Sequence, residues 1–322
     1  MSENGRRKRI AVTGGAGFIG GNLVRQLHDD DRMDRVVVVD DLSTGHRDNL
    51  AGLDVDLHVG SILDPERLDR AFAGVDGIVH LAARPSVPRS IADPIASHHA
   101  NATGTLEVLE AARRAGNPHV IVASSSSVYG SNPTLPKSED LRTQPLSPYA
   151  VSKLATETYA LAYAHCFGLP VLAFRFFNVF GPLQAAGHAY AAVLPIFLDA
   201  ALRGDPLPID GDGLQTRDFT YVGSVTSAIT EALVRGATSD EPVNLAFGSR
   251  RTILEAVEQL ESLLGRELAR DHRPPRPGDV RHSQADGTRL LELLPEVRPV
   301  AFDDGCEATL SWFRTLPVYA GV

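Results

Sequence analysis

The sequence predicts an α/β fold, in which a doubly wound parallel sheet forms the main part of the chain and a smaller C-terminal substrate lobe completes it. Three observations predict it. Apolar segments of strand length alternate with segments of helical spacing through the first half, the first apolar segment runs into a glycine-rich turn, and the pattern becomes irregular from about residue 178. Such alternation is typical of a parallel sheet with helices on both faces.

Six apolar segments are the expected strands: residues 10–13, 36–39, 55–59, 77–81, 120–123 and 171–175. The expected helices lie between them: near 22–27, 65–73, 94–115 and 149–167. Ligands of parallel sheets bind beyond the carboxyl ends of the strands. We therefore expect the serines that follow the fifth strand, residues 124–127, to face a ligand cleft, although four serines could instead form a polar turn.

The first expected strand leads into Gly14-Gly15-Ala16-Gly17-Phe18-Ile19-Gly20, after which helical spacing begins. Glycines allow a tight turn and a close approach of the backbone to a pyrophosphate, whose charge then meets the N-terminus of the helix. Asp40 ends the second strand, twenty positions beyond Gly20, where a carboxylate can accept hydrogen bonds from an adenosine ribose. Because Asp40 and Asp41 would repel a 2′-phosphate, the sequence predicts a Rossmann-type domain that binds NAD and not NADP.

Tyr149 and Lys153 lie four residues apart, directly after Ser147-Pro148. A helix places side chains at this spacing on one face. An adjacent ammonium and a cationic cofactor favour the phenolate of a tyrosine, which can then act as a base near neutral pH. The pair is therefore a candidate catalytic pair, although the same spacing also occurs by chance in helices.

Length and composition describe an ordinary globular protein. The chain has 322 residues, of which 43% are hydrophobic and 22% charged, and a formal net charge of −9. The net charge argues against a general affinity for nucleic acid or an anionic membrane. The longest apolar stretch, residues 189–202, contains Pro195 and Asp199 and is too short to span a membrane. Cys166 and Cys306 have no disulfide or metal spacing, and the N-terminus lacks a signal core, so we expect a cytoplasmic protein without a metal site.

The chain is expected to divide into two parts. Residues 1–177 should form the NAD-binding domain, and residues 217–248 should cross back to it. Residues 178–216 and 249–322, where Gly- and Pro-rich loops are frequent, should form the substrate-binding lobe.

Several segments resemble the extended short-chain dehydrogenases. They are the glycine turn, Ser125-Ser126-Ser127-Val128-Tyr129-Gly130, Tyr149-Ala150-Val151-Ser152-Lys153, Arg175-Phe176-Phe177-Asn178, Gln215-Thr216-Arg217-Asp218-Phe219 and Gly278-Asp279-Val280-Arg281-His282-Ser283. The resemblance covers nearly the whole chain. Within that superfamily the chain is most similar to nucleotide-sugar 4-epimerases, particularly the UDP-N-acetylglucosamine 4-epimerases.

The resemblance implies that carbon 4 of the sugar is first oxidised and then reduced again, with no net oxidation. Tyr149 would take the proton of the sugar 4-hydroxyl while a hydride leaves the same carbon for NAD. Ser125 would share that proton, and Lys153 would hold the cofactor ribose and lower the pKa of Tyr149. The hydride then returns to the opposite face of the 4-keto sugar, so that one carbon is inverted.

The resemblance also implies two sets of binding residues. The cofactor set is Gly14, Gly17, Phe18, Ile19, Gly20, Asp40, Ser43, Thr44, Gly45, Ser61, Ile62, Leu81, Ala82, Ala83, Asn101, Ser124, Tyr149, Lys153 and Phe176. The substrate set is Ser125, Ser126, Ser127, Asn178, Gln184, Ala192, Val193, Arg217, Arg276, Asp279 and Ser283. Arg217 and Arg276 would clamp the diphosphate of UDP, because guanidinium groups suit phosphate oxygens.

Three positions bear on the type of reaction. Related dehydratases carry Asp-Glu where this chain has Ser126 and Ser127, and related decarboxylases carry Glu at the position of Ser127. Hydroxyl groups are poor proton shuttles near neutral pH, so these positions favour epimerisation over dehydration or decarboxylation. Ser283 stands where epimerases restricted to glucose and galactose carry Tyr, so the pocket has room for an N-acetyl group without requiring one.

We therefore expect UDP-N-acetylglucosamine as substrate, with activity on UDP-glucose, and a uronic-acid substrate is the next candidate. The two rival functions are those of an NAD-binding sensor without catalysis and of a net dehydrogenase.

Ser61 replaces the Asp that commonly binds adenine, so adenine recognition should be weaker. The resemblance finally suggests a homodimer, in which helices near 95–115 and 149–167 of each subunit form a four-helix bundle.

Overall fold

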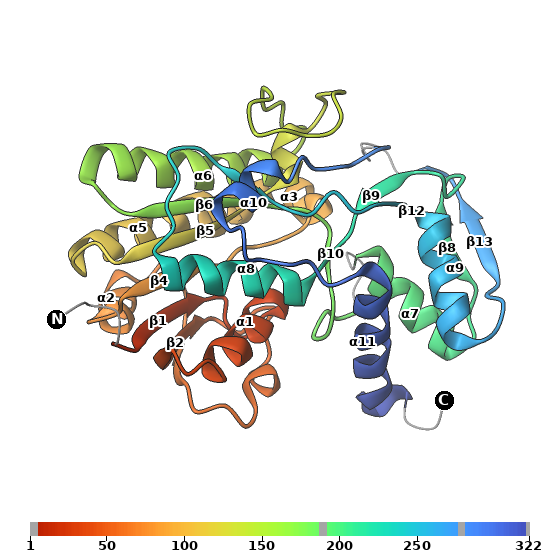
Figure 1. Ribbon diagram of the computed structural model, residues 1–322, viewed down its shortest axis with the longest axis horizontal. Helices are drawn as coiled ribbons and strands as arrows, with labels where there is room; N and C mark the ends of the chain where they lie inside the picture. The colour runs from red at the N-terminus through yellow and green to blue at the C-terminus, as the bar shows by residue number, and fades with distance from the viewer. Residues whose placement is uncertain (1–5, 187–191, 276–280, 320–322) are drawn as a thin grey trace.

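The computed structural model describes residues 6–186, 192–275 and 281–319 (Figure 1). Its centre is a seven-stranded sheet in the order β11-β6-β5-β4-β1-β2-β3. The strands are β1 (Lys8–Thr13), β2 (Met33–Asp40), β3 (Asp56–Val59), β4 (Gly77–His80), β5 (His119–Ser125), β6 (Val171–Phe176) and β11 (Val243–Leu245). Every neighbouring pair is parallel, which confirms the predicted fold class and the six expected strands.

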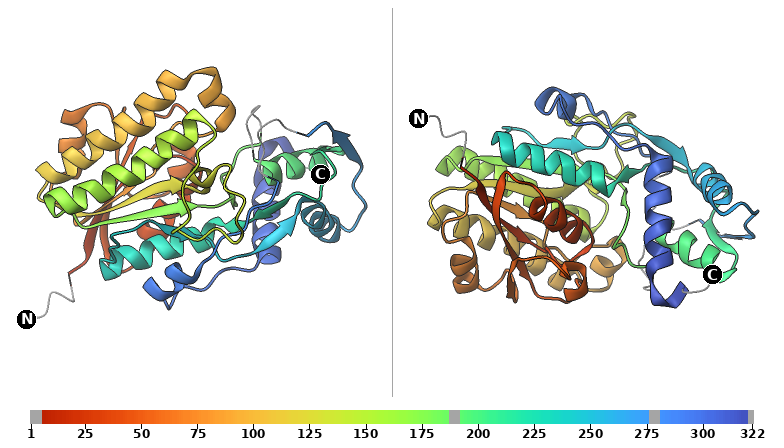
Figure 2. Two further views of the ribbon diagram at one scale, coloured as in Figure 1. Left: turned by 90° about the horizontal axis from the view of Figure 1, so that it is seen from above. Right: turned by 60° about the horizontal axis from the view of Figure 1, so that its bottom comes forward.

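Helices cover both faces of this sheet (Figure 2). One face carries α1 (Phe18–His28), α8 (Val222–Arg235) and α10 (Thr288–Leu293), and the other carries α2 (Pro65–Phe72), α5 (Gly104–Arg114) and α6 (Pro148–Phe167). The alternation of side chains along β1 explains the two cores, because Ile10 and Val12 pack on the α1 side and Ala11 packs on the α6 side. Both faces of the strands are therefore apolar, as the continuous hydrophobic runs predicted.

The helix expected near 94–115 is interrupted. It consists of α4 (Pro94–His98), a π-helical turn η2 (His99–Thr103) and α5. Asn101 lies in this turn and is 1% exposed. A π-helical turn inside a helix often occurs at a functional site, and this one brings Asn101 against the neighbouring helix α6.

The short helical elements that connect the sheet strands are η1 (Arg47–Leu50), α3 (Val87–Ala92) and η3 (Ser126–Tyr129). The first follows β2, the second follows β4 and the third follows β5. The loops at this edge of the sheet therefore carry short helical turns instead of extended chain.

The remainder of the chain forms a smaller lobe beside the carboxyl edge of the sheet (Figure 1). Its elements are β7 (Val179–Phe180), α7 (Val193–Arg203), β8 (Leu207–Asp210), β9 (Thr216–Asp218), β10 (Thr220–Tyr221), β12 (Arg250–Thr252), α9 (Ile253–Leu264), β13 (Arg270–Arg273), α11 (Phe302–Thr315) and η4 (Pro317–Tyr319). Three two-stranded sheets pair β10 with β7, β12 with β9 and β13 with β8. A separate core that includes Phe197, Phe219 and Phe302 holds this lobe together.

The chain leaves the lobe through β10 and returns to the main sheet through α8 and β11. The strand β11 pairs with β6 at the edge of the sheet. Among the described helices, none has the length and the apolar character that crossing a membrane requires.

Candidate active site

A cavity of about 1220 Å³ opens at the carboxyl edge of the sheet. It lies where the strand order reverses between β1 and β4, the position at which ligands of doubly wound sheets bind. The predicted site residues that line it are Gly14, Gly17, Phe18, Ile19, Gly20, Asp40, Ser43, Thr44, Ser61, Ile62, Leu81, Ala82, Ala83, Ser124, Ser125, Tyr149, Lys153, Phe176, Asn178 and Gln184. The structure therefore gathers most of the predicted cofactor residues and the three predicted catalytic residues in one cavity.

The glycine turn has the geometry that a close approach of a ligand requires. Gly14 has a φ of +71°, a conformation that favours glycine, and its N–H donates to the carbonyl of Val39 at 2.7 Å. A Cβ at Gly20 would lie 2.0 Å from the carbonyl oxygen of Gly14. Only glycine fits at position 20, so the turn packs directly against the start of α1. The first residues of α1 line the cavity and no side chain caps this helix, so its free N–H groups can receive a diphosphate.

Asp40 lies at the end of β2, on the floor of the cavity. Its carboxylate accepts hydrogen bonds from the backbone N–H of Ala16 at 2.9 Å and of Leu42 at 2.8 Å. Burial raises the pKa of Asp40, and these two hydrogen bonds lower it by less. Gly45 does not line the cavity but packs behind Asp40, because a Cβ there would lie 3.0 Å from Oδ1. The carboxylate is thus fixed in place and still has free lone pairs for ribose hydroxyls.

Tyr149 and Lys153 occupy the first two turns of α6. Ser147 caps this helix, since its Oγ accepts a hydrogen bond from the N–H of Ala150 at 3.1 Å, and Pro148 is the first helical residue. The capped start explains why Tyr149 and Lys153 fall on the face of α6 that points to the cavity.

The side chains of Tyr149 and Ser125 line the same cavity, where the Ser125 hydroxyl is close enough to influence the pKa of the phenol. Burial raises the pKa of Tyr149, and Ser125 lowers it by less. Ser125 lies at the last position of β5, and its Oγ accepts a hydrogen bond from the N–H of Ser127 at 3.2 Å. The two hydroxyls can therefore share one substrate oxygen.

Lys153 is 6% exposed, and its Nζ donates to the carbonyl oxygen of Ala123 at 2.8 Å. Burial lowers the pKa of Lys153 to about 8. The ammonium is thus still mostly protonated at neutral pH, although its proton is held much less tightly than in water. The sequence predicted that Lys153 lowers the pKa of Tyr149, whereas burial is the dominant influence on Tyr149 in this structure.

Some predicted residues do not line the cavity among the residues that the structure describes: Gly45, Asn101, Ser126, Ser127, Ala192, Val193, Arg217 and Ser283. The amide of Asn101 instead bonds both the N–H and the C=O of Arg84 and the hydroxyl of Ser152. Asn101 therefore shapes the cavity from behind, because Arg84 lines it.

The expectation that residues 124–127 share one cleft with the cofactor holds for Ser124 and Ser125, not for the next two serines. Ser126 and Ser127 begin the 3₁₀ turn η3, and neither is among the residues that line the cavity. Ser126 and Ser127 thus form a polar turn, which was the alternative expected for this segment. The Oγ of Ser127 is buried and has no hydrogen-bond partner among the described residues.

The predicted substrate residues of the lobe are spread over three segments. Arg217 lies on β9, where Nη1 donates to the carbonyl of Thr216 at 2.9 Å, and the N–H of Ser283 donates to the same carbonyl group at 3.1 Å. Ala192 and Val193 lie at the start of α7. Arg276 and Asp279 fall outside the described residues, so the expected pair of arginines stays a prediction.

Asn178 and Gln184 both lie on the cavity wall after β6. Asn178 donates from Nδ2 to the carbonyl of Asp218 at 3.3 Å, and Gln184 donates from Nε2 to the carbonyl of Val179 at 3.1 Å. The Oε1 of Gln184 is buried without a partner within the described part of the chain. An unpaired buried amide oxygen is costly, so this atom is a candidate acceptor for a ligand N–H or O–H.

Sequence reasoning missed the arginines of the cavity wall. Arg84 and Arg89 line the cavity from the segment that follows β4, and Arg84 forms an ion pair with Asp93 at 3.2 Å. Their position after a strand end was the only signal that could have indicated them. In the described ranges, no group of three or more His, Cys, Asp and Glu side chains is arranged to hold a metal ion.

Comparison with known proteins identifies relatives along nearly the whole chain. Residues 10–246 match the family model of the NAD dependent epimerase/dehydratase family. A UDP-glucose 4-epimerase of Mycolicibacterium smegmatis is 36% identical over 313 residues, which cover 95% of this chain and 98% of that protein.

Solved structures are equally similar. A UDP-N-acetylglucosamine 4-epimerase from Methanobrevibacter ruminantium, in complex with UDP-N-acetylmuramic acid, has a TM-score of 0.90 and 34% identity, and the match covers 96% of this chain and 98% of that one. A UDP-glucuronic acid 4-epimerase from Bacillus cereus, in complex with UDP-glucuronic acid and NAD, has a TM-score of 0.86 and 30% identity, with 95% and 99% covered.

Proposed function

Because the chain belongs to the NAD-dependent epimerase/dehydratase family, within the extended short-chain dehydrogenases, we propose that it inverts carbon 4 of a UDP-linked hexose. The observation that carries this proposal is that Tyr149, Ser125 and buried Lys153 meet on the wall of one cavity that starts at a dinucleotide-type glycine turn. The family confirms the resemblance seen in the sequence and NAD as the cofactor.

The residues present fit NAD. Gly20 leaves no space for a Cβ, so the turn can lie directly against a diphosphate, and Asp40 can bind the adenosine ribose. Ser61, which replaces the expected Asp, lies on the cavity wall, but its Oγ already accepts the N–H of Leu63 at 3.1 Å. When bound, NAD supplies the acceptor and later the donor of the hydride at carbon 4.

The protein's own groups move the proton. Tyr149 removes the proton of the 4-hydroxyl and returns it after inversion, and Ser125 holds the same oxygen through its hydroxyl. Burial of Tyr149 opposes its ionisation, so the proposal requires positive charge at the site during the first step. Lys153 provides one such charge while it is protonated, which is the case below about pH 8.

Epimerisation is favoured over dehydration at this site. Loss of the 6-hydroxyl needs an acid and a base besides the tyrosine. Ser126 and Ser127 offer only hydroxyls at the positions where related dehydratases carry Asp and Glu, and neither residue is among those that line the cavity. The chain therefore lacks the groups that dehydration would require at these positions.

UDP-N-acetylglucosamine is the proposed preferred substrate, and UDP-glucose is expected to react as well. Two features support this choice: the small side chain of Ser283 and the unpaired Oε1 of Gln184, which can accept a hydrogen bond from the acetamido N–H. UDP-glucuronate is the second candidate, because the chain is also similar to a UDP-glucuronic acid 4-epimerase.

We further propose that residues 178–216 and 249–322 bind the UDP-sugar and that the enzyme is a homodimer. Exposed apolar side chains on α4 and α6 support the dimer: Ile95 is 67%, Val151 54% and Phe167 47% exposed. Sedimentation of the protein at micromolar concentration tests this proposal, since a monomer would contradict it.

The decisive experiment is incubation with UDP-N-acetylglucosamine, UDP-glucose and UDP-glucuronate in separate reactions, followed by separation of the 4-epimers. We expect conversion of the first sugar at the highest kcat/KM. Tyr149→Phe should abolish conversion and retain NAD, whereas Tyr159→Phe, which removes an exposed hydroxyl from the same helix, should behave as wild type. Conversion of none of the sugars by the wild type would refute the proposed function, and accumulation of free NADH would indicate a net dehydrogenase.

A further inference from the structure

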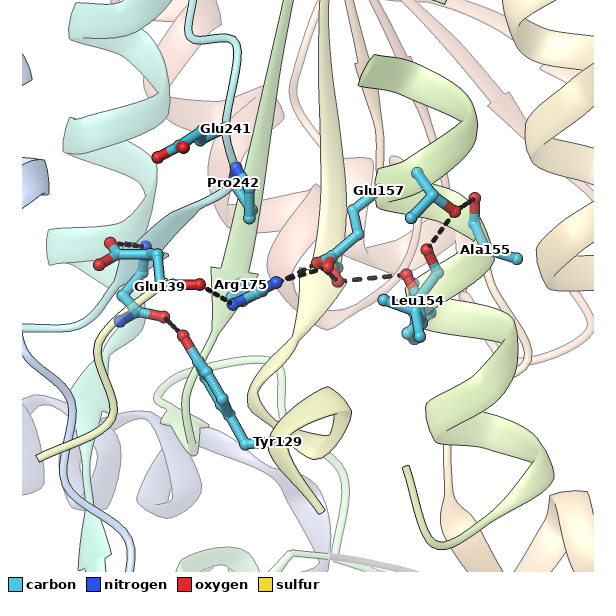
Figure 3. Close-up of polar contacts among 12 residues, drawn as sticks. Tyr129, Glu139, Leu154, Ala155, Glu157, Arg175, Glu241 and Pro242 are labelled. Atoms are coloured by element: carbon cyan, nitrogen blue, oxygen red, sulfur yellow. Dashed lines mark hydrogen bonds and ion pairs between the residues drawn. The ribbon is translucent and has the colours of Figure 1, made fainter. Parts of the chain in front are cut away.

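A buried ion pair lies behind the wall of the cavity (Figure 3). Glu157 on α6 and Arg175 on β6 form two parallel hydrogen bonds, from Nη2 to Oε1 at 2.6 Å and from Nε to Oε2 at 3.0 Å. Their side chains are only 2% and 4% exposed. Neither residue lines the cavity, so the pair does not touch a ligand there.

Stability alone does not account for this pair. Two charges removed from water lose hydration that their attraction only just repays, so well-packed apolar residues of similar volume often stabilise a core equally well. Glu157 on α6 and Arg175 on β6 follow or precede residues of an apolar core, such as Ala160 and Ala173. The contacts of the pair with its neighbours indicate a second role.

One set of contacts leads to the catalytic helix and to the end of β5. The hydroxyl of Ser124 donates to Oε2 of Glu157 at 2.6 Å and lies 3.2 Å from the carbonyl oxygen of Lys153. Ser124 precedes Ser125 in β5, and Glu157 lies one helical turn after Lys153. The carboxylate thus joins the strand that carries one catalytic residue to the helix that carries the other two.

Another set of contacts leads across the sheet. Strand register places Arg175 opposite Ser124 on one side and opposite Asn244 of β11 on the other. The guanidinium also lies 4.8 Å from the centroid of the Tyr129 ring, whose hydroxyl donates to Oδ1 of Asn244 at 2.7 Å. Arg175 donates in addition from Nη1 to the carbonyl of Glu139 at 3.3 Å, so each of its three guanidinium nitrogens donates a hydrogen bond (Figure 3).

We propose that Glu157 and Arg175 are positioning residues that hold the end of β5 against α6, so that Ser125 stays beside Tyr149 on the cavity wall. This inference rests on the proposed function, because the positioned pair is the acid–base pair of the proposed reaction. Two parallel hydrogen bonds from Arg175 fix the orientation of the Glu157 carboxylate. The carboxylate in turn accepts a hydrogen bond from Ser124, which holds the neighbouring Ser125 in place. An apolar pair would fill the same volume but would leave the strand end free to shift.

The test uses the double variant Glu157→Leu/Arg175→Met, which removes both charges together and leaves neither buried alone. We expect it to keep its melting temperature and its NAD affinity close to those of wild type. Turnover should fall about 10- to 100-fold, because a misplacement of about 1 Å can cost ~100-fold in rate. KM should change little, since the substrate contacts remain.

A second measurement does not depend on turnover. The alkaline titration of Tyr149 is followed by ultraviolet absorbance in the NAD complex, as the difference between each protein and its Tyr149→Phe counterpart. Loss of the Ser125 contact should raise the pKa of Tyr149 further in the double variant, because Ser125 lowers it in wild type. A purely structural role of the ion pair would leave this titration unchanged.

A matched control is Glu261→Leu/Arg270→Met, which removes an ion pair of 3.1 Å in the C-terminal lobe. It should leave turnover and the titration of Tyr149 at wild-type values, and an equal loss in the control would overturn the proposal. Wild-type turnover and titration in the folded Glu157/Arg175 double variant would also overturn it.

Two further outcomes remain informative. If wild type converts no sugar, the proposed function fails, and the titration alone decides whether the ion pair positions Ser125. If the double variant does not fold, Ser124→Ala decides, because it breaks the link to β5 and keeps both charges paired. Unchanged turnover and an unchanged titration in Ser124→Ala would then refute the inference.

Discussion

Replacement of Lys153 by Met should remove a charge that the folded protein holds at a cost. Burial lowers the pKa of Lys153 from 10.5 to about 8, a difference of about 2.5 pH units. At about 1.36 kcal/mol per unit, the ammonium costs ~3.4 kcal/mol of folding free energy below pH 8. Met removes this cost but leaves the carbonyl of Ala123 without its donor, which costs about 1–3 kcal/mol. The variant should therefore be more stable than wild type near neutral pH, by up to ~2 kcal/mol.

The pH dependence of stability separates this effect from simple repacking. The pKa of Lys153 is lower in the folded than in the unfolded state, so between the two values the unfolded chain binds more protons. Wild-type stability should consequently rise with pH through the window from about 8 to about 10.5. Between about pH 7 and about pH 9.5, wild type should gain ~2 kcal/mol relative to Lys153→Met.

The assay is urea unfolding of nucleotide-free protein, followed by circular dichroism at several pH values. Lys153→Arg is the control, because a guanidinium stays charged throughout this range and its stability should not rise. Both variants should also lose turnover, by about 10²- to 10⁴-fold, since the charge beside Tyr149 is lost or displaced. Equal pH slopes for wild type and Lys153→Met would refute the claim that burial perturbs this lysine.

Three other predictions concern the cofactor turn and the thiols. Gly20→Ala should abolish NAD binding in calorimetric titration, because its Cβ would lie 2.0 Å from a backbone oxygen, whereas Gly17→Ala, with a nearest contact of 3.3 Å, should lose less. Asp40→Ala should weaken NAD by about 1–3 kcal/mol and reduce the preference for NAD over NADP, and an unchanged preference would contradict the role of the carboxylate. A thiol reagent should label exposed Cys166 and spare Cys306, since burial raises the pKa of the Cys306 thiol to about 12; labelling of both in native protein would contradict this.

The sequence was sufficient where the information is local. The turn from Gly14 to Gly20 requires residues without a Cβ, and the acid at Asp40 follows the next strand at a regular distance, so both were readable as a dinucleotide site. The spacing of Tyr149 and Lys153 behind a Ser-Pro helix start likewise determined that both side chains share one face of α6. Apolar periodicity predicted the parallel sheet and its order of strands and helices along the chain.

The tertiary structure decided what depends on neighbours that are distant in the sequence. The pairing of Ser124, Arg175 and Asn244 arises from strand register, and no local pattern reveals which residue lies opposite another across three strands. Glu157 follows Lys153 at helical spacing, yet only the packing of α6 on β6 shows that its partner is Arg175.

Long-range packing also decides which predicted residues line the cavity, and Asn101 and Ser126 are two that do not line it in the described structure. Asn101 was expected at the cofactor, but a π-helical turn moves its amide to the backbone of Arg84. Ser126 was expected at the substrate, but it begins the 3₁₀ turn η3 and is not among the residues that line the cavity. Sequence alone therefore determined the fold and the chemical groups of the site, whereas side-chain directions, burial and the pKa values that follow from burial were fixed only when the elements packed together.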